Sequence, residues 1–184
     1  YPFAVTPEMS AFAKEATRGC RSGKERLTCL QHALFDRDGF EFVYAAHATL
    51  SADRAFAEQR GNCFAFTALF VALARAVGED ARFVAVPAAP GVGRDAGESL
   101  VIVTEHVVAA AFEPDRVHVF DFQQGSDTWA RLHPLEDRVA SALFHSNRGG
   151  RWVRQGAAEA GRAELELAVR LAAEWPPGWV NLGV

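Results

Sequence analysis

The chain contains, in this order, a cysteine, a histidine and an aspartate that together could carry out thiol chemistry: Cys63, His106 and Asp121. Cys63 stands in the stretch "RGNCFAFTALFVALARAVGEDARFVAV", residues 60–86, at the expected first turn of an apolar helix. Backbone N–H groups at a helix N-terminus stabilise a thiolate, and they can also bind the oxyanion that forms when a thiolate attacks a carbonyl. Acyl chemistry further requires a histidine within hydrogen-bond reach of the thiol and a third group that orients this histidine.

Two of the six histidines, His106 and His118, lie on the β-rich runs "LVIVTEHVVAAAF" and "RVHVFDF", which the short segment "EPD" separates. This pattern predicts an antiparallel hairpin with one of the two histidines on each strand. We interpret three of the histidines as structural or surface residues: His118, His133 and His145.

The register of this hairpin decides whether His106 can work with Asp121. Closure of the turn by Glu113 and Arg116 sets the pairing of the two strands, and Val108 then lies opposite Asp121. His106 is two residues from Val108 and shares its face, so it lies diagonally across from Asp121, about 7–8 Å away at the backbone. We therefore predict that His106 is the base and Asp121 its orienting carboxylate. A slip of one residue would reverse the faces.

Each of these residues also has a purely structural interpretation. Cys63 alone would suit the interior of a buried helix, and His106 alone would suit an apolar strand. Asp121 lies between Phe120 and Phe122, where a buried charge without a partner would be costly. Because His106 would remove that cost, we favour a nucleophile with two partners over three unrelated structural residues.

The segments that precede the cysteine predict helices separated by turns. Apolar spacing indicates a helical region over 9–35, broken in two around 18–24 by two glycines. An extended segment over 42–48 follows, and then a helix with Ser51 as its N-cap. We expect Gly61 to end that helix in the left-handed conformation.

The cysteine-bearing segment predicts a helix followed by a strand. Asn62 suits the N-cap, and the broad apolar set over 63–77 indicates a central, largely buried helix that Gly78 ends. "ARFVAV" at 81–86 predicts a strand, and the Pro/Gly-rich residues 87–99 predict a loop before the hairpin. The fold class is therefore α+β, with the cysteine-bearing helix packed on an antiparallel sheet.

Length and composition restrict the class of protein. A chain of 184 residues, 49% apolar and 23% charged, is long enough for one well-packed domain with a small appendage. The net charge of −4 and the lack of a dense Lys/Arg patch argue against a nucleic-acid partner. No apolar run reaches the roughly 20 residues of a membrane span. We expect no metal and no cofactor.

The three cysteines lack the CxxC pairing of a zinc or redox site. Cys20 and Cys29 would form a disulfide in an exported protein, which leaves Cys63 unpaired; otherwise both are reduced core or surface residues. The compartment stays open between these alternatives, and we prefer export, as a periplasmic protein or lipoprotein, to the cytoplasm.

The stretch 60–86, followed by "EHVV" and "VFDF", resembles the transglutaminase-like superfamily, a branch of the papain-like cysteine enzymes. The resemblance covers roughly residues 25–125: a Gly-x-Cys opens a helix, an R-A-x-G-x-x-A-R run leads into a strand, and a histidine and an aspartate follow on successive strands. It implies Cys63 as nucleophile, His106 as general base and acid, and Asp121 as orienting carboxylate. The chain has "HVV" and "DF" where the family commonly has H-A-W and D-P, which leaves the substrate groove and the reaction open.

A weak repeat of 34 residues marks the C-terminal region, where Gly149 corresponds to Gly183. "WVNLG" near the end is similar to the opening of a tetratricopeptide repeat, and bacterial proteins couple such repeats to transglutaminase-like domains. We therefore expect a catalytic domain over 1–134 and a helix-turn-helix segment that resembles a tetratricopeptide repeat over 135–184.

Together these features predict a thiol-dependent acyl-transfer enzyme. We expect a cysteine peptidase or amidase that acts on an amide bond of a peptide or protein through a thioester, with transfer to an amine left open. The alternative is a catalytically idle papain-like module that recruits a protein partner through its helical repeat. The intact set of Cys63, His106 and Asp121 argues against the idle alternative.

Overall fold

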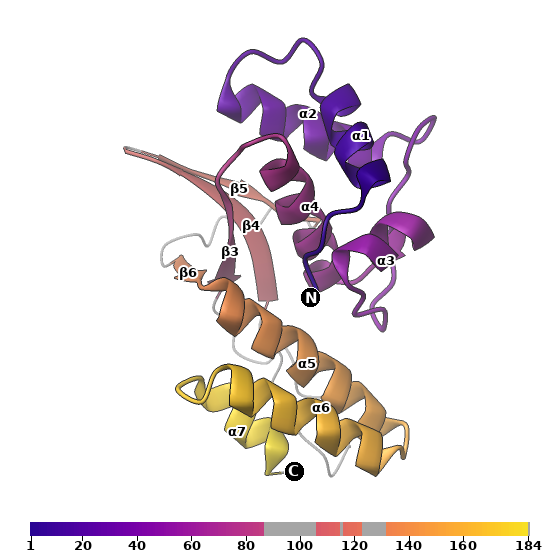
Figure 1. Ribbon diagram of the computed structural model, residues 1–184, viewed down its shortest axis with the longest axis vertical. Helices are drawn as coiled ribbons and strands as arrows, with labels where there is room; N and C mark the ends of the chain where they lie inside the picture. The colour runs from indigo at the N-terminus through magenta and orange to yellow at the C-terminus, as the bar shows by residue number, and fades with distance from the viewer. Residues whose placement is uncertain (87–105, 115, 123–131, 184) are drawn as a thin grey trace. The chain divides into compact units, whose positions relative to one another are not determined.

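The structure, a computed structural model, describes residues 1–86, 106–114, 116–122 and 132–183 (Figure 1). The chain divides into two compact units. Of the described residues, the first unit holds 1–84, 107–114 and 116–122, and the second holds 85, 86, 106 and 132–183. The loop predicted at 87–99 lies outside the described residues.

Two helices occupy the N-terminal segment, α1 (Pro7–Ala16) and α2 (Gly23–Phe35), and they confirm the predicted break. The Ser22 hydroxyl accepts a hydrogen bond from the N–H of Glu25, and the Glu25 carboxylate accepts one from the N–H of Ser22, both at 3.2 Å. This capping box satisfies N–H groups that the helix itself leaves unpaired, so it fixes where α2 begins.

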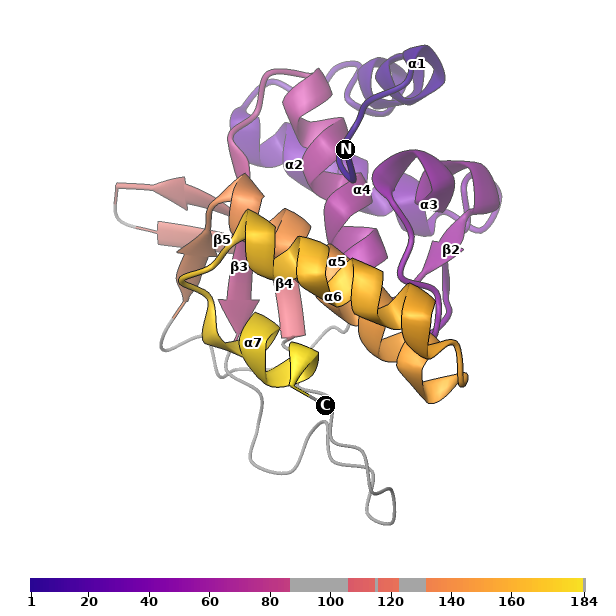
Figure 2. The same cartoon turned by 60° about the horizontal axis from the view of Figure 1, so that its bottom comes forward.

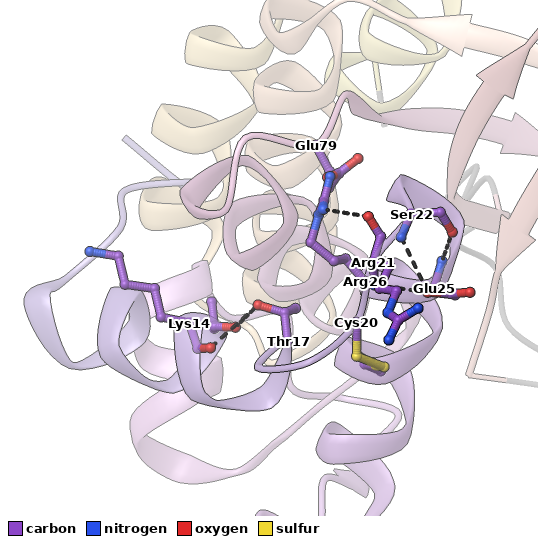
Figure 3. The surroundings of a disulfide bond; sticks show 10 residues. Lys14, Thr17, Cys20, Arg21, Ser22, Glu25, Arg26 and Glu79 are labelled. Carbon is purple, nitrogen blue, oxygen red and sulfur yellow. Dashed lines mark hydrogen bonds and ion pairs between the residues drawn. A yellow bond between two sulfur atoms is a disulfide. The ribbon is translucent and has the colours of Figure 1, made fainter.

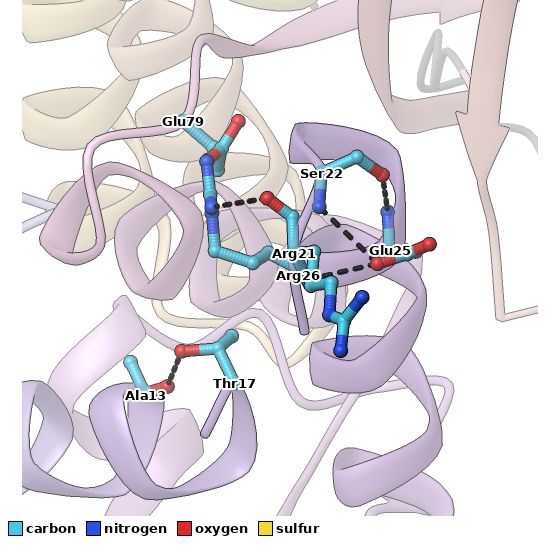
Figure 4. Close-up of polar contacts among 7 residues, drawn as sticks. All are labelled: Ala13, Thr17, Arg21, Ser22, Glu25, Arg26 and Glu79. Carbon is cyan, nitrogen blue, oxygen red and sulfur yellow. Dashed lines mark hydrogen bonds and ion pairs between the residues drawn. The ribbon is translucent and has the colours of Figure 1, made fainter. Parts of the chain in front are cut away.

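A disulfide between Cys20 and Cys29 ties the segment between these helices to α2 (Figure 3). Of the two alternatives for these cysteines, the structure has the bonded one, and Cys63 is the free thiol. Beside the disulfide, Arg26 of α2 forms an ion pair with Glu79 (Figure 4). The ion pair connects α2 to the turn that follows the helix beginning at Cys63.

A short parallel pair of strands, β1 (Val43–Tyr44) and β2 (Arg60–Gly61), flanks helix α3 (Ala52–Glu58) in the sequence. The N-cap of α3 is Ser51, as predicted. Helix α3 connects the two strands, so their pairing puts Tyr44 opposite Gly61 although the two residues are distant in sequence.

The prediction that Gly61 ends α3 in the left-handed conformation is wrong. Gln59 adopts that conformation, with φ 51°, and Gly61 lies in β2. Gly61 is needed for a different reason, because a Cβ at this position would collide with the Cβ of Ala65. A side chain here would therefore push the strand away from the start of the next helix.

Helix α4 (Cys63–Ala76) lies at the centre of the first unit and contacts α1, α2, α3 and β2. Its N-cap is Asn62, whose side-chain oxygen accepts a hydrogen bond from the N–H of Ala65 at 3.1 Å. The same side chain donates to the Thr49 hydroxyl at 2.8 Å. Residues 64–74 are all buried, as expected for a helix enclosed on every side. The predicted cap and the predicted central helix are both confirmed.

Three strands are neighbours in one sheet, in the order β5 (Arg116–Phe120), β4 (His106–Glu113) and β3 (Ala81–Val86). β4 and β5 form an antiparallel hairpin in which Glu113 pairs with Arg116 and Ala111 pairs with His118. This is the register that the sequence predicted, so the alternation of faces along the hairpin is confirmed as well.

Phenylalanine side chains join α4 to this sheet. Phe70 stacks on Phe120 with ring centroids 4.7 Å apart, and Phe64 stacks on Phe83 with centroids 6.1 Å apart. Full burial of such a side chain contributes about 1.5–3 kcal/mol to stability. The contacts therefore hold α4 firmly against β5 and β3.

The second unit contains a short strand, β6 (His133–Leu135), and three helices, α5 (Asp137–Arg154), α6 (Ala158–Leu171) and α7 (Pro176–Leu182). Helices α5 and α6 lie side by side in both views (Figures 1 and 2). A Cβ at Gly149 would lie 2.9 Å from the carbonyl oxygen of Gly161, so the two backbones approach as closely as only glycine permits. The predicted helix-turn-helix arrangement is present.

The helices of this unit also carry buried polar side chains. Asn181 donates a hydrogen bond from its Nδ2 to the Ser146 hydroxyl at 2.8 Å, and both residues are fully buried. This bond satisfies polar groups that would otherwise be costly inside the unit. Within the described ranges, no helix is both long enough and apolar enough to cross a membrane.

Candidate active site

Cys63 is the first residue of α4, and its side chain is half-buried. Two backbone hydrogen bonds fix the turn around it: the Asn62 N–H donates to the Ala48 carbonyl, and the Phe66 N–H donates to the Asn62 carbonyl, both at 3.0 Å. The N–H groups of Cys63 and Phe64 therefore precede the first intrahelical hydrogen bond. They lie at the positive end of the helix dipole, where unpaired N–H groups can bind a negatively charged atom.

Asp121 directly follows β5, and only 7% of its surface is exposed. Gln31 of α2 donates from its Nε2 to the backbone carbonyl of Asp121 at 3.4 Å. The ring of the next residue, Phe122, contacts four other aromatic rings, those of Phe35, Phe42, Tyr44 and Phe66. These contacts hold the backbone that bears the carboxylate against α2 and α4.

Tyr44 lies next to both of these segments, and sequence reasoning missed it. In the parallel pair of β1 and β2, Tyr44 lies opposite Gly61, two residues before Cys63. Its ring centroid is 4.9 Å from that of Phe122, the neighbour of Asp121. Tyr44 is therefore fixed on one side by the strand that leads into α4 and on the other by the segment after β5.

The electrostatics of Tyr44 place Cys63 and Asp121 in one neighbourhood. Burial, followed by the negative charges of Cys63 and Asp121, raises the pKa of the Tyr44 phenol above its ordinary value. Because such charge effects decline with distance, both groups lie near the same phenol. Tyr44 is 40% exposed, so this neighbourhood is open to solvent. The predicted nucleophile and the predicted carboxylate thus both act on the phenol of Tyr44.

His106 is the first residue of β4 and is half-buried. In the first unit, the buried Thr67 of α4 donates from its hydroxyl to the carbonyl of Val107 at 3.0 Å. Thr67 follows Cys63 by four residues, so the two side chains share a face of α4. This hydrogen bond fastens the residue beside His106 to the face of α4 that bears the thiol.

Two of the remaining histidines lie near carboxylates elsewhere. The Nε2 of His118 lies 3.3 Å from a carboxylate oxygen of Glu113 in the same hairpin, and the Nδ1 of His145 lies 2.6 Å from a carboxylate oxygen of Glu164. Both contacts agree with the structural interpretation of these residues. In the parts of the chain that the structure describes, no group of three or more His, Cys, Asp or Glu side chains could hold a metal ion.

A family model of the transglutaminase-like superfamily matches residues 10–132. The match covers more than half of the chain and includes Cys63, His106 and Asp121, so the chain belongs to the transglutaminase-like superfamily. Its mixed helices and strands, with a cysteine at the start of a central helix, are consistent with a papain-like fold. The match ends before α5 and does not extend to the helices of the second unit. No curated protein and no solved structure matches the chain significantly.

Proposed function

We propose that this chain is a thiol-dependent acyl-transfer enzyme, a cysteine peptidase or amidase that acts on an amide bond through Cys63, His106 and Asp121. The observation that carries the proposal is a free thiol at the N-terminus of a buried helix, in a member of the transglutaminase-like superfamily. A buried aspartate, Asp121, acts on the same tyrosine phenol as this thiol. A carboxylate in such an apolar setting needs a polar partner, and a protonated imidazole would supply one.

Two features support His106 as the third member. The hairpin register, continued by one residue beyond β5, would put Asp121 opposite Val108, on the face that His106 shares by strand alternation. The hydrogen bond from Thr67 to the Val107 carbonyl fastens the start of β4 to α4. His106 would thus be available to both the thiol and the carboxylate.

In the proposed reaction, His106 takes the proton of Cys63, and the sulfur forms a bond to the carbonyl carbon while the π electrons move to the oxygen. When the C=O bond re-forms, the C–N bond breaks and His106 gives its proton to the leaving amine. Water then attacks the thioester carbon and gives one proton to His106. The C–S bond breaks, which releases the acid, and His106 returns the proton to the sulfur. An amine in place of water would give a transamidated product.

The test is acylation by a peptide-like ester or amide, followed by mass spectrometry of the intact protein. The wild-type protein should gain the acyl mass at Cys63, and Cys63→Ala should gain none. His106→Ala should acylate about 100-fold or more slowly, because general acid–base catalysis is worth at least that factor. His32→Ala, a change at an exposed histidine of α2, is the matched control. Full turnover by Cys63→Ala would overturn the proposal.

A second candidate is an interaction module whose helical segment, resembling a tetratricopeptide repeat, recruits a protein partner. Trp152 and Trp179 favour it, since they are 39% and 52% exposed on helices of the second unit. The rate of alkylation by iodoacetamide against pH separates the candidates. A profile centred near an ordinary thiol value of about 8.5 would favour the interaction module, and a profile displaced to lower pH would favour the enzyme.

The domain boundaries and the cellular compartment of the protein are part of the same proposal. We place the catalytic domain at residues 1–134 and the helical segment at 135–184. Disulfides persist mainly in oxidising compartments, so the Cys20–Cys29 bond supports an exported protein. The expected substrate is a peptide or protein.

A further inference from the structure

We propose that Tyr44 is a catalytic residue, whose phenol O–H donates a hydrogen bond to the oxyanion formed when Cys63 attacks a carbonyl. This inference rests on the proposed function and adds a residue that neither the sequence motifs nor the family match assigns. The N-terminus of α4 supplies one hydrogen-bond donor to this oxyanion, the backbone N–H of Cys63. An oxyanion hole usually has two donors, and a side chain from another segment can supply the second.

The position of Tyr44 is set by backbone pairing and ring packing. The parallel register puts Tyr44 opposite Gly61, and the N–H of Ala45 donates to the Gly61 carbonyl at 2.9 Å. β1 therefore lies against the strand that leads directly to the N-terminus of α4, where the backbone donors are. The ring of Phe122 packs against the tyrosine ring at 4.9 Å and limits its rotation.

The chemistry of the phenol suits a donor to a transient negative charge. Burial and the neighbouring charges of Cys63 and Asp121 raise the pKa of Tyr44, so its proton stays bound throughout the neutral range and is available for donation. The residue is 40% exposed, so it can be reached from solvent. Phenylalanine at this position would keep the ring packing and remove only the hydroxyl.

The first experiment needs no substrate and uses the fact that the chain has two tyrosines, Tyr1 and Tyr44. In Tyr1→Phe, tyrosinate absorbance during an alkaline titration reports Tyr44 alone. Its midpoint should lie above about 10, the ordinary value for tyrosine. Adding Cys63→Ala or Asp121→Asn should move it down, because each removes a negative charge. An ordinary midpoint that neither change shifts would overturn the placement of Tyr44, whether or not the protein is an enzyme.

The second experiment compares two reactions of the same thiol. Acylation by a p-nitrophenyl ester passes through an oxyanion, whereas alkylation by iodoacetamide does not. Tyr44→Phe should reduce acylation about 100-fold, a typical cost of losing one oxyanion donor, and leave the alkylation rate unchanged. Tyr1→Phe, a change at a tyrosine that is 75% exposed, is the matched control and should alter neither rate.

The other outcomes each decide a different point. Equal loss of the acylation and alkylation rates in Tyr44→Phe would mean that the phenol acts on the thiol itself. Unchanged rates would mean that the phenol has no role in either reaction. Either result overturns the inference while the proposed function stands. Absence of acylation in the wild-type protein would overturn the proposed function and, with it, the catalytic role. Circular dichroism and urea unfolding of Tyr44→Phe separate a loss of folding from a loss of the donor.

Discussion

At the N-terminus of α4, Asn62 caps the helix and Cys63 supplies a free thiol. The side chain of Asn62 satisfies the N–H of Ala65 and at the same time donates to Thr49, so the cap is itself held in place. Cys63 follows without a covalent partner and meets the helix dipole at its positive end. A single residue of the wrong type at position 62 would therefore alter both the stability of the helix and the setting of the thiol.

Replacement of Asn62 by alanine should lower the free energy of unfolding by about 1 kcal/mol, because the cap of α4 is lost. Asn62→Ser retains an acceptor for the N–H of Ala65 and should recover most of this loss. Urea unfolding followed by circular dichroism measures both variants. Equal stability of the alanine variant and the wild type would show that the cap contributes nothing to the fold.

At the scale of elements, close approach of backbones decides where the site can form. β2 meets the first turn of α4 at Gly61, whose missing Cβ leaves space for Ala65. The hairpin of β4 and β5 then determines which residues face α4, since its register fixes the alternation along both strands. The candidate site thus depends on two packing arrangements, and neither involves the side chains of Cys63, His106 or Asp121.

Gly61→Ala should destabilise the protein by about 1–3 kcal/mol, because the added methyl collides with the Cβ of Ala65. The double variant Gly61→Ala/Ala65→Gly removes the collision at a cost of about 1 kcal/mol for glycine in a helix. A double-mutant cycle of unfolding free energies should therefore show favourable coupling between the two sites. Strictly additive effects would contradict the proposed collision.

At the scale of the whole molecule, the chain combines a family-matched unit with a helical unit and contains one disulfide. The disulfide joins cysteines nine residues apart and stabilises the fold mainly by restricting the unfolded chain. It joins the segment between α1 and α2 to α2 itself, away from Cys63 in sequence. Reduction should therefore affect stability without changing the Cys63 thiol.

Reduction with dithiothreitol should lower the unfolding free energy by about 2–3 kcal/mol, the value expected for a short closed loop. The variant Cys20→Ser/Cys29→Ser should show a similar loss and should no longer respond to the reductant. Urea midpoints with and without dithiothreitol give both comparisons. A wild-type midpoint that does not change on complete reduction would show that the bond contributes nothing to stability.

Several features of the fold were predictable because they depend on neighbours in the sequence. Asn62 and the apolar run after it specify a capped, buried helix, and Glu113 and Arg116 fix a tight hairpin whose register follows from the turn. Ser51 likewise marks the start of α3. In each case the local preference and the final structure agree, since hydrogen bonds and burial within a short segment decide the outcome.

The sequence by itself determined the family, the cysteine-bearing helix and the hairpin that carries His106 and leads to Asp121. Only the tertiary structure decided that Tyr44 belongs beside them and that Gly61 serves packing rather than a helix end. Both depend on β1 pairing with β2 across α3, a contact between residues distant in the chain. Non-local pairing leaves no periodic signal in either segment, so only the folded chain shows that Tyr44 lies opposite Gly61 and packs on Phe122.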